Sequence, residues 1–137
     1  MRCWTTEIDL KSGNSLTHPQ QLVDVTVLWP EGSHVYKING TYQLITAAGG
    51  TQGNGHRVMS YRSSVSPTGP WEANPRNPVL QATSGSALTR TGHADIVEGK
   101  DGRWWSVFLG VREINGVAQL GMSILNAAAS LLTRTND

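Results

Sequence analysis

Two segments of the sequence match each other, and this internal repeat constrains the fold more than any other feature. Residues 31–42 align with residues 92–104, first at an offset of 61 residues and then of 62 after one insertion. In this alignment Val35 pairs with Ile96. A repeat of short strands at this spacing is typical of β-propeller blades. Two such units could also form the two sheets of a β-sandwich, so the repeat alone leaves both folds open.

Short strands punctuated by Gly, Pro and Asn fill most of the chain, and no amphipathic helical stretch of useful length appears before residue 124. The sequence therefore predicts an all-β fold. Asn39-Gly40 between two apolar runs predicts a hairpin turn. The last strand of the first unit is rich in Pro and Asn and is expected at an outer edge. Strands are expected at 35–38, 41–46, 57–62 and 71–80, and then at 94–98, 103–109 and 119–125.

Composition excludes several classes of function. The chain is 38% hydrophobic and 15% charged, with a net charge of +1, which is ordinary for a globular domain. Lys and Arg occur singly, so neither a nucleic-acid partner nor a membrane surface is expected. Cys3 is the only cysteine, which excludes an internal disulfide. The first residues lack the apolar core of a signal peptide, no apolar run is long enough to span a membrane, and the compartment is left open.

Several motifs occur in an order that is more specific than any one of them. The main ones are Pro-Glu-Gly-Ser-His-Val-Tyr-Lys at 30–37, Ala-Gly-Gly-Thr at 48–51, Thr-Gly-His-Ala-Asp-Ile-Val-Glu at 91–98, and Trp-Trp-Ser-Val-Phe-Leu-Gly-Val-Arg at 104–112. Together they resemble the later blades of glycoside hydrolase family 43, whose members include β-xylosidases and α-L-arabinofuranosidases. The resemblance covers about residues 4 to 121. Residues 62–63, 68–72 and 77–80 fit the connecting strands of the same family.

This resemblance implies a partial five-bladed β-propeller, with about two blades plus the tail of a third. One blade is expected at 31–80, most of a second at 92–125, and the tail of a preceding blade at 2–29. The expected domain is therefore 1–125. Residues 126–137 are expected to form a divergent tail, whose Ala and Leu content favours a short helix or a frayed end.

The resemblance also implies inverting hydrolysis of glycosidic bonds. In that chemistry one carboxylic acid protonates the leaving oxygen and a carboxylate activates water. The position of the family's acid is Glu31, where Trp29 and Pro30 would exclude water and favour the protonated form. From the residues alone, Glu31 in a Pro-Glu-Gly turn is an ordinary solvated side chain.

Two further residues match positions near the sugar. His93 resembles the family's axial histidine, which lies under the sugar and helps to hold a calcium or sodium ion, largely through water. A single His next to Gly is more commonly a structural hydrogen-bonding group, and one nitrogen is a poor ligand for these hard cations. Thr51 falls where the family places a residue near the substrate, although a turn threonine explains it equally well. No cofactor is required.

The chain also departs from the family pattern. The family's water-activating Asp lies on the first blade, and a second Asp that tunes the acid lies on a middle blade, so neither is expected here. Asp24 and Asp95 are the nearest alternatives, and neither matches the position of the base. Ser33 replaces a Pro, Ala48 replaces an acidic residue, and Met122 stands where a substrate-binding arginine is expected.

The resulting hypothesis is a glycoside hydrolase-like chain related to xylosidic or arabinofuranosidic substrates, inactive by itself, whose partner is a xylo- or arabino-oligosaccharide. The alternative is a non-catalytic sugar-binding or inert propeller remnant. A protein-interaction propeller is disfavoured because kelch and WD motifs are absent.

Two expectations concern packing. Trp104 and Trp105 are expected in the core rather than stacked on sugar, because neighbours on a strand face opposite sides. Apolar residues on open blade faces are expected to be exposed and to promote self-association, with Val58, Tyr61, Ile96 and Val107 as the candidates.

Overall fold

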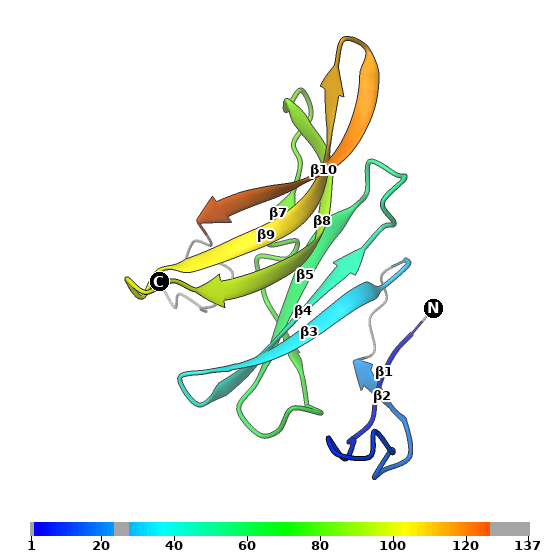
Figure 1. Cartoon of the computed structure of the whole chain (residues 1–137), viewed down its shortest axis with the longest axis vertical. Helices are drawn as coiled ribbons and strands as arrows, with labels where there is room; N and C mark the ends of the chain where they lie inside the picture. Colours follow the sequence, from blue (N-terminus) through cyan, green and yellow to red (C-terminus); the bar gives the residue numbers. More distant parts are fainter. Residues whose placement is uncertain (1, 24–27, 127–137) are drawn as a thin grey trace.

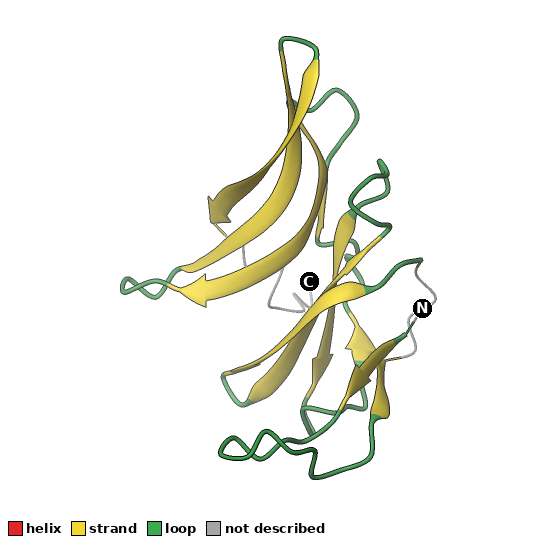
Figure 2. Cartoon of the chain, turned by 45° about the vertical axis from the view of Figure 1, so that its right-hand side comes forward, coloured by secondary structure: helices red, strands yellow, loops and turns green. Residues whose placement is uncertain are grey.

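The computed structural model describes residues 2–23 and 28–126. These residues form strands and loops without a helix, which confirms the predicted all-β fold (Figure 2). Accordingly, the described part of the chain contains no helix that could span a membrane.

The strands form three antiparallel sheets, which we call the N-terminal, middle and C-terminal sheets (Figure 1). The N-terminal sheet pairs β1 (Cys3–Thr5) with β2 (Gln20–Val23). The middle sheet contains β3 (Glu31–Ile38), β4 (Thr41–Ala48), β5 (Arg57–Ser63), β6 (Glu72–Ala73) and β7 (Leu80–Gln81). The C-terminal sheet contains β8 (Leu88–Glu98), β9 (Trp104–Ile114) and β10 (Val117–Asn126).

Two Asn-Gly turns set the register of the hairpins. The predicted turn at Asn39-Gly40, with φ of 49° and 80°, joins β3 to β4 as expected. A second turn at Asn115-Gly116, with φ of 52° and 75°, joins β9 to β10. Asn and Gly suit these positions because both tolerate positive φ. The second dipeptide carried the same signal in the sequence.

The middle sheet packs against a neighbour on each face. One core unites Ile45 and Val58 of the middle sheet with residues of the C-terminal sheet, namely Ala94, Ile96 and Phe108. A second core unites Leu44 and Tyr61 with Leu22 of the N-terminal sheet. Face-to-face packing of this kind removes alternate residues of each strand from water.

The prediction that four apolar residues are exposed is wrong for three of them. Val58, Tyr61 and Ile96 are only 0%, 7% and 6% exposed, because the sheets that carry them cover one another. Val107 is half-buried.

The expected fourth strand at 71–80 is interrupted. Within this segment, only β6 and β7 pair with β5. The residues between them include Pro75 and Pro78, which lack the N–H that a strand needs. The side chain of Asn77 replaces part of the strand pairing. Its Nδ2 donates to the carbonyl of Ser60 and its Oδ1 accepts from the N–H of Ser60, both at 2.8 Å.

The strands of the C-terminal sheet are longer than expected. Strand β10 begins at Val117 rather than at residue 119 and continues through Asn126, paired with β9 along its length. The expected tail at 126–137 therefore begins inside a strand, and its remainder, 127–137, lies outside the described residues.

Candidate functional site

Glu31 is the first residue of β3 and its side chain is exposed. Its backbone is held by the neighbouring strand, because the hydroxyl of Thr46 donates to the Glu31 carbonyl at 3.1 Å. Ser33, which replaces the family's Pro, donates through its own hydroxyl to Thr46 Oγ1 at 2.9 Å. Gly32 between them has φ of 55°, and the register of β3 shifts at this point. The polar contacts therefore fix a bulged strand end with Glu31 at its tip.

His93 lies against this strand end. A Cβ added at Gly32 would lie 2.4 Å from His93 Nε2, so the imidazole rests on the backbone of a residue that must be glycine. The sequence predicted a strand at 94–98, but β8 begins at Leu88, so His93 is its sixth residue. It has φ of 52°, and the register of β8 shifts on either side of Gly92. This bulge turns His93 out of the regular strand and brings its ring onto Gly32, the residue that follows Glu31.

Thr51 lies in the loop between β4 and β5, and it is half-buried. Two contacts tie this loop to the residues just before Glu31. The N–H of Gly49 donates to the carbonyl of Leu28 at 2.7 Å, and a Cβ at Gly50 would lie 3.8 Å from the indole of Trp29. The three residues predicted from the sequence thus lie around one end of the middle sheet.

Water is not excluded from Glu31 within this chain. Pro30 is buried, but Trp29 is 58% exposed and Glu31 itself is exposed. Trp29 also has φ of 56°, an uncommon conformation for an aromatic residue. Trp29 and Pro30 therefore do not by themselves produce the dry setting that was expected.

His56 was missed by the sequence analysis. Its side chain is fully buried, and its Nδ1 lies 2.8 Å from the carbonyl oxygen of Arg90 on β8. A Cβ at Gly92 would lie 2.4 Å from His56 Nε2, so this ring rests on Gly92 as His93 rests on Gly32. The sequence carried a signal for it, since the dipeptide Gly-His occurs at 55–56 as well as at 92–93.

Asp95 is engaged in a contact between the sheets. The hydroxyl of Tyr36 donates to its carboxylate, and the same hydroxyl accepts from the N–H of Ile96 at 3.3 Å. The Tyr36 hydrogen bond lowers the pKa of Asp95 below its usual value of 3.8, while burial and then Asp95 raise the pKa of Tyr36. A carboxylate held in this way stabilises the sheet interface and is poorly placed to activate water.

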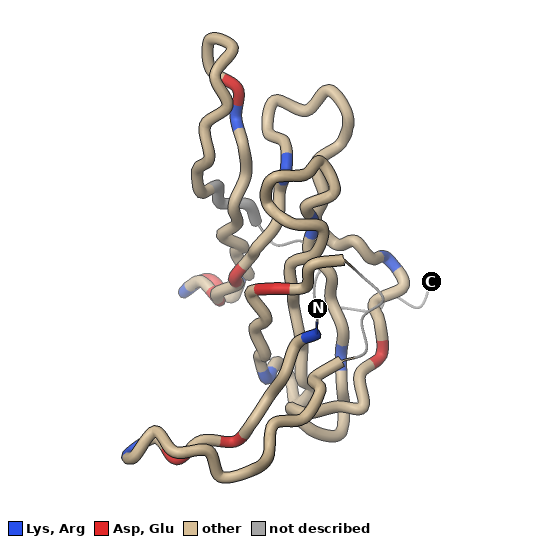
Figure 3. Tube along the Cα trace, turned by 90° about the vertical axis from the view of Figure 1, so that its right-hand side faces the viewer, with Lys and Arg blue, Asp and Glu red and all other residues tan. Residues whose placement is uncertain are grey.

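Metal binding by side chains alone is not supported. Among residues 2–23 and 28–126, no group of three or more His, Cys, Asp or Glu could hold a metal ion. Calcium and sodium need several oxygen ligands, so these residues do not fit a directly held ion. The water-mediated ion expected at His93 stays a prediction. Acidic and basic side chains are interspersed along the chain (Figure 3).

The two neighbouring tryptophans face different surroundings. Trp104 packs against the core between the middle and C-terminal sheets, as expected. Trp105 lies under the guanidinium of Arg103, with the Arg103 Cζ 5.2 Å from its ring centroid. Neither core includes Trp105, so the expectation that both tryptophans pack there is wrong for this one.

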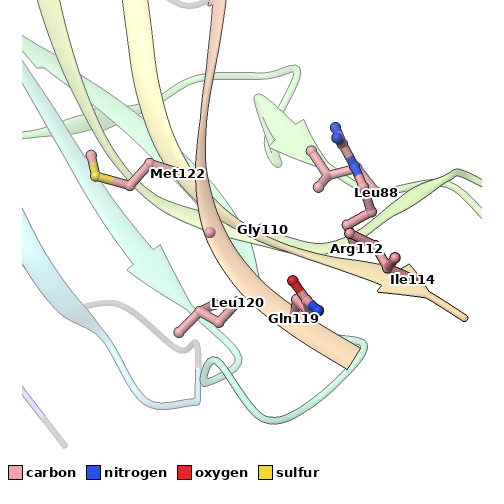
Figure 4. A pocket seen from close by; sticks show the side chains of 8 residues that line it. Leu88, Gly110, Arg112, Ile114, Gln119, Leu120 and Met122 are labelled. Atoms are coloured by element: carbon pink, nitrogen blue, oxygen red, sulfur yellow. The ribbon is translucent and has the colours of Figure 1, made fainter. Parts of the chain in front are cut away.

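One pocket lies apart from these residues, on the C-terminal sheet (Figure 4). It includes none of the predicted site residues. The residues that line it are Leu88, Gly110, Arg112, Ile114, Gln119, Leu120, Gly121 and Met122.

Known proteins resemble the chain in sequence and in structure. It is 48% identical over 92 residues to a non-reducing end α-L-arabinofuranosidase of Bacteroides ovatus, covering 66% of this chain and 17% of that protein. It is 33% identical over 126 residues to a xylosidase/arabinosidase of Butyrivibrio fibrisolvens, covering 86% of this chain and 24% of that protein. The chain thus spans less than a quarter of the length of these relatives.

Solved structures agree. The Bacteroides ovatus xyloglucan PUL GH43B structure is 36% identical, with a TM-score of 0.81, over 90% of this chain and 25% of that one. A family 43 protein of Bacillus licheniformis is 30% identical with the same TM-score and the same coverage. The model of the glycosyl hydrolases family 43 matches residues 2–126. The chain therefore belongs to glycosyl hydrolase family 43.

Proposed function

We propose that the chain is the acid-bearing part of a glycosidase that acts on xylosidic or arabinofuranosidic bonds with inversion, and that Glu31 is its general acid. The observation that carries the proposal is the contact between Gly32 and His93, which joins the strand end bearing Glu31 to a second sheet. The names of the relatives, an arabinofuranosidase and a xylosidase/arabinosidase, support the substrate class.

The middle and C-terminal sheets are, in this proposal, two blades of a five-bladed propeller, and the N-terminal sheet is the tail of a third. Two features support it. The sheets pack face to face, and the matching segments of the repeat form β3–β4 and β8–β9, the corresponding hairpins of the two sheets. Glu31 and His93 then belong to neighbouring blades, with Thr51 on the loop beside Glu31.

Thr51 and His93 are proposed to contact the sugar. Their support is position, since the Thr51 loop is bonded to Leu28 and the His93 ring lies on Gly32. An ion held through water at His93 would add positive charge beneath the sugar, but no step of the reaction is assigned to it.

The chain by itself is proposed to be inactive. Inverting hydrolysis needs a base across the sugar from the acid, and each acid or base group contributes roughly 10²–10⁴-fold. Asp95 is engaged by Tyr36, and Asp24 lies outside the described residues. A non-catalytic sugar-binding or inert remnant is the alternative.

Two assays test the proposal. The purified chain is expected to release no aryl group from aryl xyloside or aryl arabinofuranoside. If it does release the aryl group, and if Glu31→Gln abolishes that turnover, the proposed inactivity is wrong. Next, the chain replaces the matching segment of the Bacteroides ovatus relative. This chimera is expected to hydrolyse aryl arabinofuranoside, and Glu31→Gln in it is expected to slow turnover roughly 10²–10⁴-fold. If the chimera is active and Glu31→Gln leaves its turnover unchanged, Glu31 is not the acid.

A further inference from the structure

His56 is the most buried histidine of the described chain, and it reaches across a sheet interface. It precedes β5 of the middle sheet, whereas its side chain contacts β8 of the C-terminal sheet. These contacts are its hydrogen bond to the Arg90 carbonyl and the packing of its ring on Gly92. Any side chain at Gly92 would collide with the ring, so the position of β8 here depends on His56.

The hydrogen bond indicates the form of the ring. Because Nδ1 faces a carbonyl oxygen, Nδ1 must carry a hydrogen and donate it to this bond. Nε2 is buried without a hydrogen-bond partner among the described residues. Burial of an unsatisfied polar nitrogen is unfavourable, so phenylalanine would suit this position better if the ring only filled space. The directional bond to Arg90 therefore gives a reason for a histidine.

His56 is also connected to the Thr51 loop through backbone contacts. A Cβ at Gly49 would lie 2.0 Å from the carbonyl oxygen of Gly55, so the two ends of the loop are in backbone contact. Within the loop, the N–H of Gly53 donates to Gly50 and the N–H of His56 donates to Gly53, both at 3.2 Å. These contacts link the backbone of His56 to both ends of the loop that contains Thr51.

On the other side, the contacts of His56 lie on β8 just before His93. Arg90 and His93 both have φ of 52°, and Gly92 lies between them. Positive φ is uncommon for residues other than glycine, and contacts with the surrounding structure help to hold it. The bond at the Arg90 carbonyl and the ring on Gly92 are two such contacts, and they immediately precede His93.

We propose that His56 is a positioning residue of the site, which holds the Thr51 loop against the bulge of β8 and thereby sets the His93 ring over Gly32, beside Glu31. This inference rests on the proposed function, because it concerns residues proposed to bind the sugar. The contacts themselves can be measured in the chain without sugar. Its effect on sugar binding is indirect, since it acts through Thr51 and His93.

The test uses nuclear magnetic resonance of the full chain, or magic-angle spinning if the chain associates. The reporters are the Thr51 methyl, the His93 ring, and the Gly32 backbone, whose resonances carry the ring-current shift of His93. His56→Phe keeps a ring but loses the donor, and is expected to move all three. His56→Asn restores an N–H near the position of Nδ1 and is expected to return the Thr51 and His93 signals toward their original values. His18→Asn, at an exposed histidine, is the control and should move none.

Core resonances of Ile45 and Phe108 show whether each variant is folded. If His56→Phe does not fold, Gly92→Ala applies the same test, because its methyl would displace the His56 ring. Folded variants in which Gly32, Thr51 and His93 keep their signals would overturn the inference. A titration with xylo- and arabino-oligosaccharides separates the two proposals. Wild-type chain that binds neither sugar contradicts the proposed function, whereas wild-type binding that His56→Phe leaves intact contradicts the positioning role.

Discussion

The middle and C-terminal sheets contain matching segments, yet their strands meet very different surroundings. Strand β4 of the middle sheet has Leu44 and Ile45 fully buried on successive positions. Strand β10 of the C-terminal sheet has Leu120 59% and Met122 71% exposed. Both strands carry apolar residues, so their own composition does not explain the difference.

The difference follows from the number of covering sheets. Leu44 faces the N-terminal sheet and Ile45 faces the C-terminal sheet, so β4 is covered on both sides. Strand β10 pairs only with β9 and forms the outer edge of its sheet in the described chain. A repeat unit therefore acquires a complete core only when a neighbour covers each of its faces.

Replacement of a core residue by alanine gives the largest expected contrast. Ile45→Ala should lower the free energy of unfolding by about 2–5 kcal/mol, because it leaves a cavity between two sheets. Leu120→Ala, on exposed β10, should change it by less than about 0.5 kcal/mol. Chemical denaturation followed by tryptophan fluorescence measures both. Equal losses in the two variants would show that β10 is covered in solution.

The outer edge of the middle sheet gives the next contrast. Asn77→Ala removes two hydrogen bonds to Ser60, each with a net value of about 0.5–1.5 kcal/mol, so a loss of about 1–3 kcal/mol is expected. The control is Asn54→Ala in an exposed loop position. A loss no greater than that of the control would mean that Asn77 does not replace a strand partner.

These contrasts also show what the sequence could reveal. Local turn residues predicted the all-β fold and the Asn39-Gly40 turn, and an ordered set of motifs predicted the family. Both kinds of signal can be recognised in the sequence itself. The burial of Val58 and Ile96 was misjudged, because it depends on which sheets face each other. The two prolines marked 71–80 as an edge, but they did not reveal that an asparagine side chain would replace strand pairing.

The candidate site was only partly accessible to sequence reasoning. Glu31, Thr51 and His93 came from motif positions, and the structure places them around one end of the middle sheet. His56 was missed because its hydrogen-bond partner, the carbonyl of Arg90, is 34 residues away in the sequence. Contacts with backbone atoms leave no complementary residue type in the sequence, so only the repeated Gly-His dipeptide hinted at them.

The Tyr36–Asp95 contact predicts a pH dependence that is specific to the sheet interface. The folded state lowers the pKa of Asp95 below 3.8, so its contribution to stability is fully present above that value. The contribution is lost as the pH falls through the lower folded pKa, when the carboxylate becomes protonated. Tyr36→Phe removes the main cause of the shift and should flatten the stability profile below about pH 4.

Unfolding measured between pH 2 and pH 6 in wild type and Tyr36→Phe compares the two profiles. The difference between them is expected to be constant above about pH 5 and to shrink as the pH falls, since protonated Asp95 no longer distinguishes the two proteins. A difference that stays constant down to pH 2 would show that Asp95 is not the titrating partner.

The smallest expected effect lies at the exposed ion pair of the middle sheet. Arg62 Nη2 lies 2.9 Å from Glu72 Oε2, and the two side chains are 40% and 67% exposed. The charges are well hydrated, so Glu72→Gln should cost only about 0.2–1 kcal/mol at low salt. Strand β6 has only two residues, and Glu72 is also the strand partner of Arg62, so the substitution has a local effect on strand pairing as well. Glu98→Gln, at the exposed end of β8, is the control, because it removes the same charge outside the pair.

At about 1 M salt the screening length falls to roughly 3 Å, so the difference between the two variants should nearly vanish. A difference that survives in high salt would assign the role of Glu72 to strand pairing rather than to its charge.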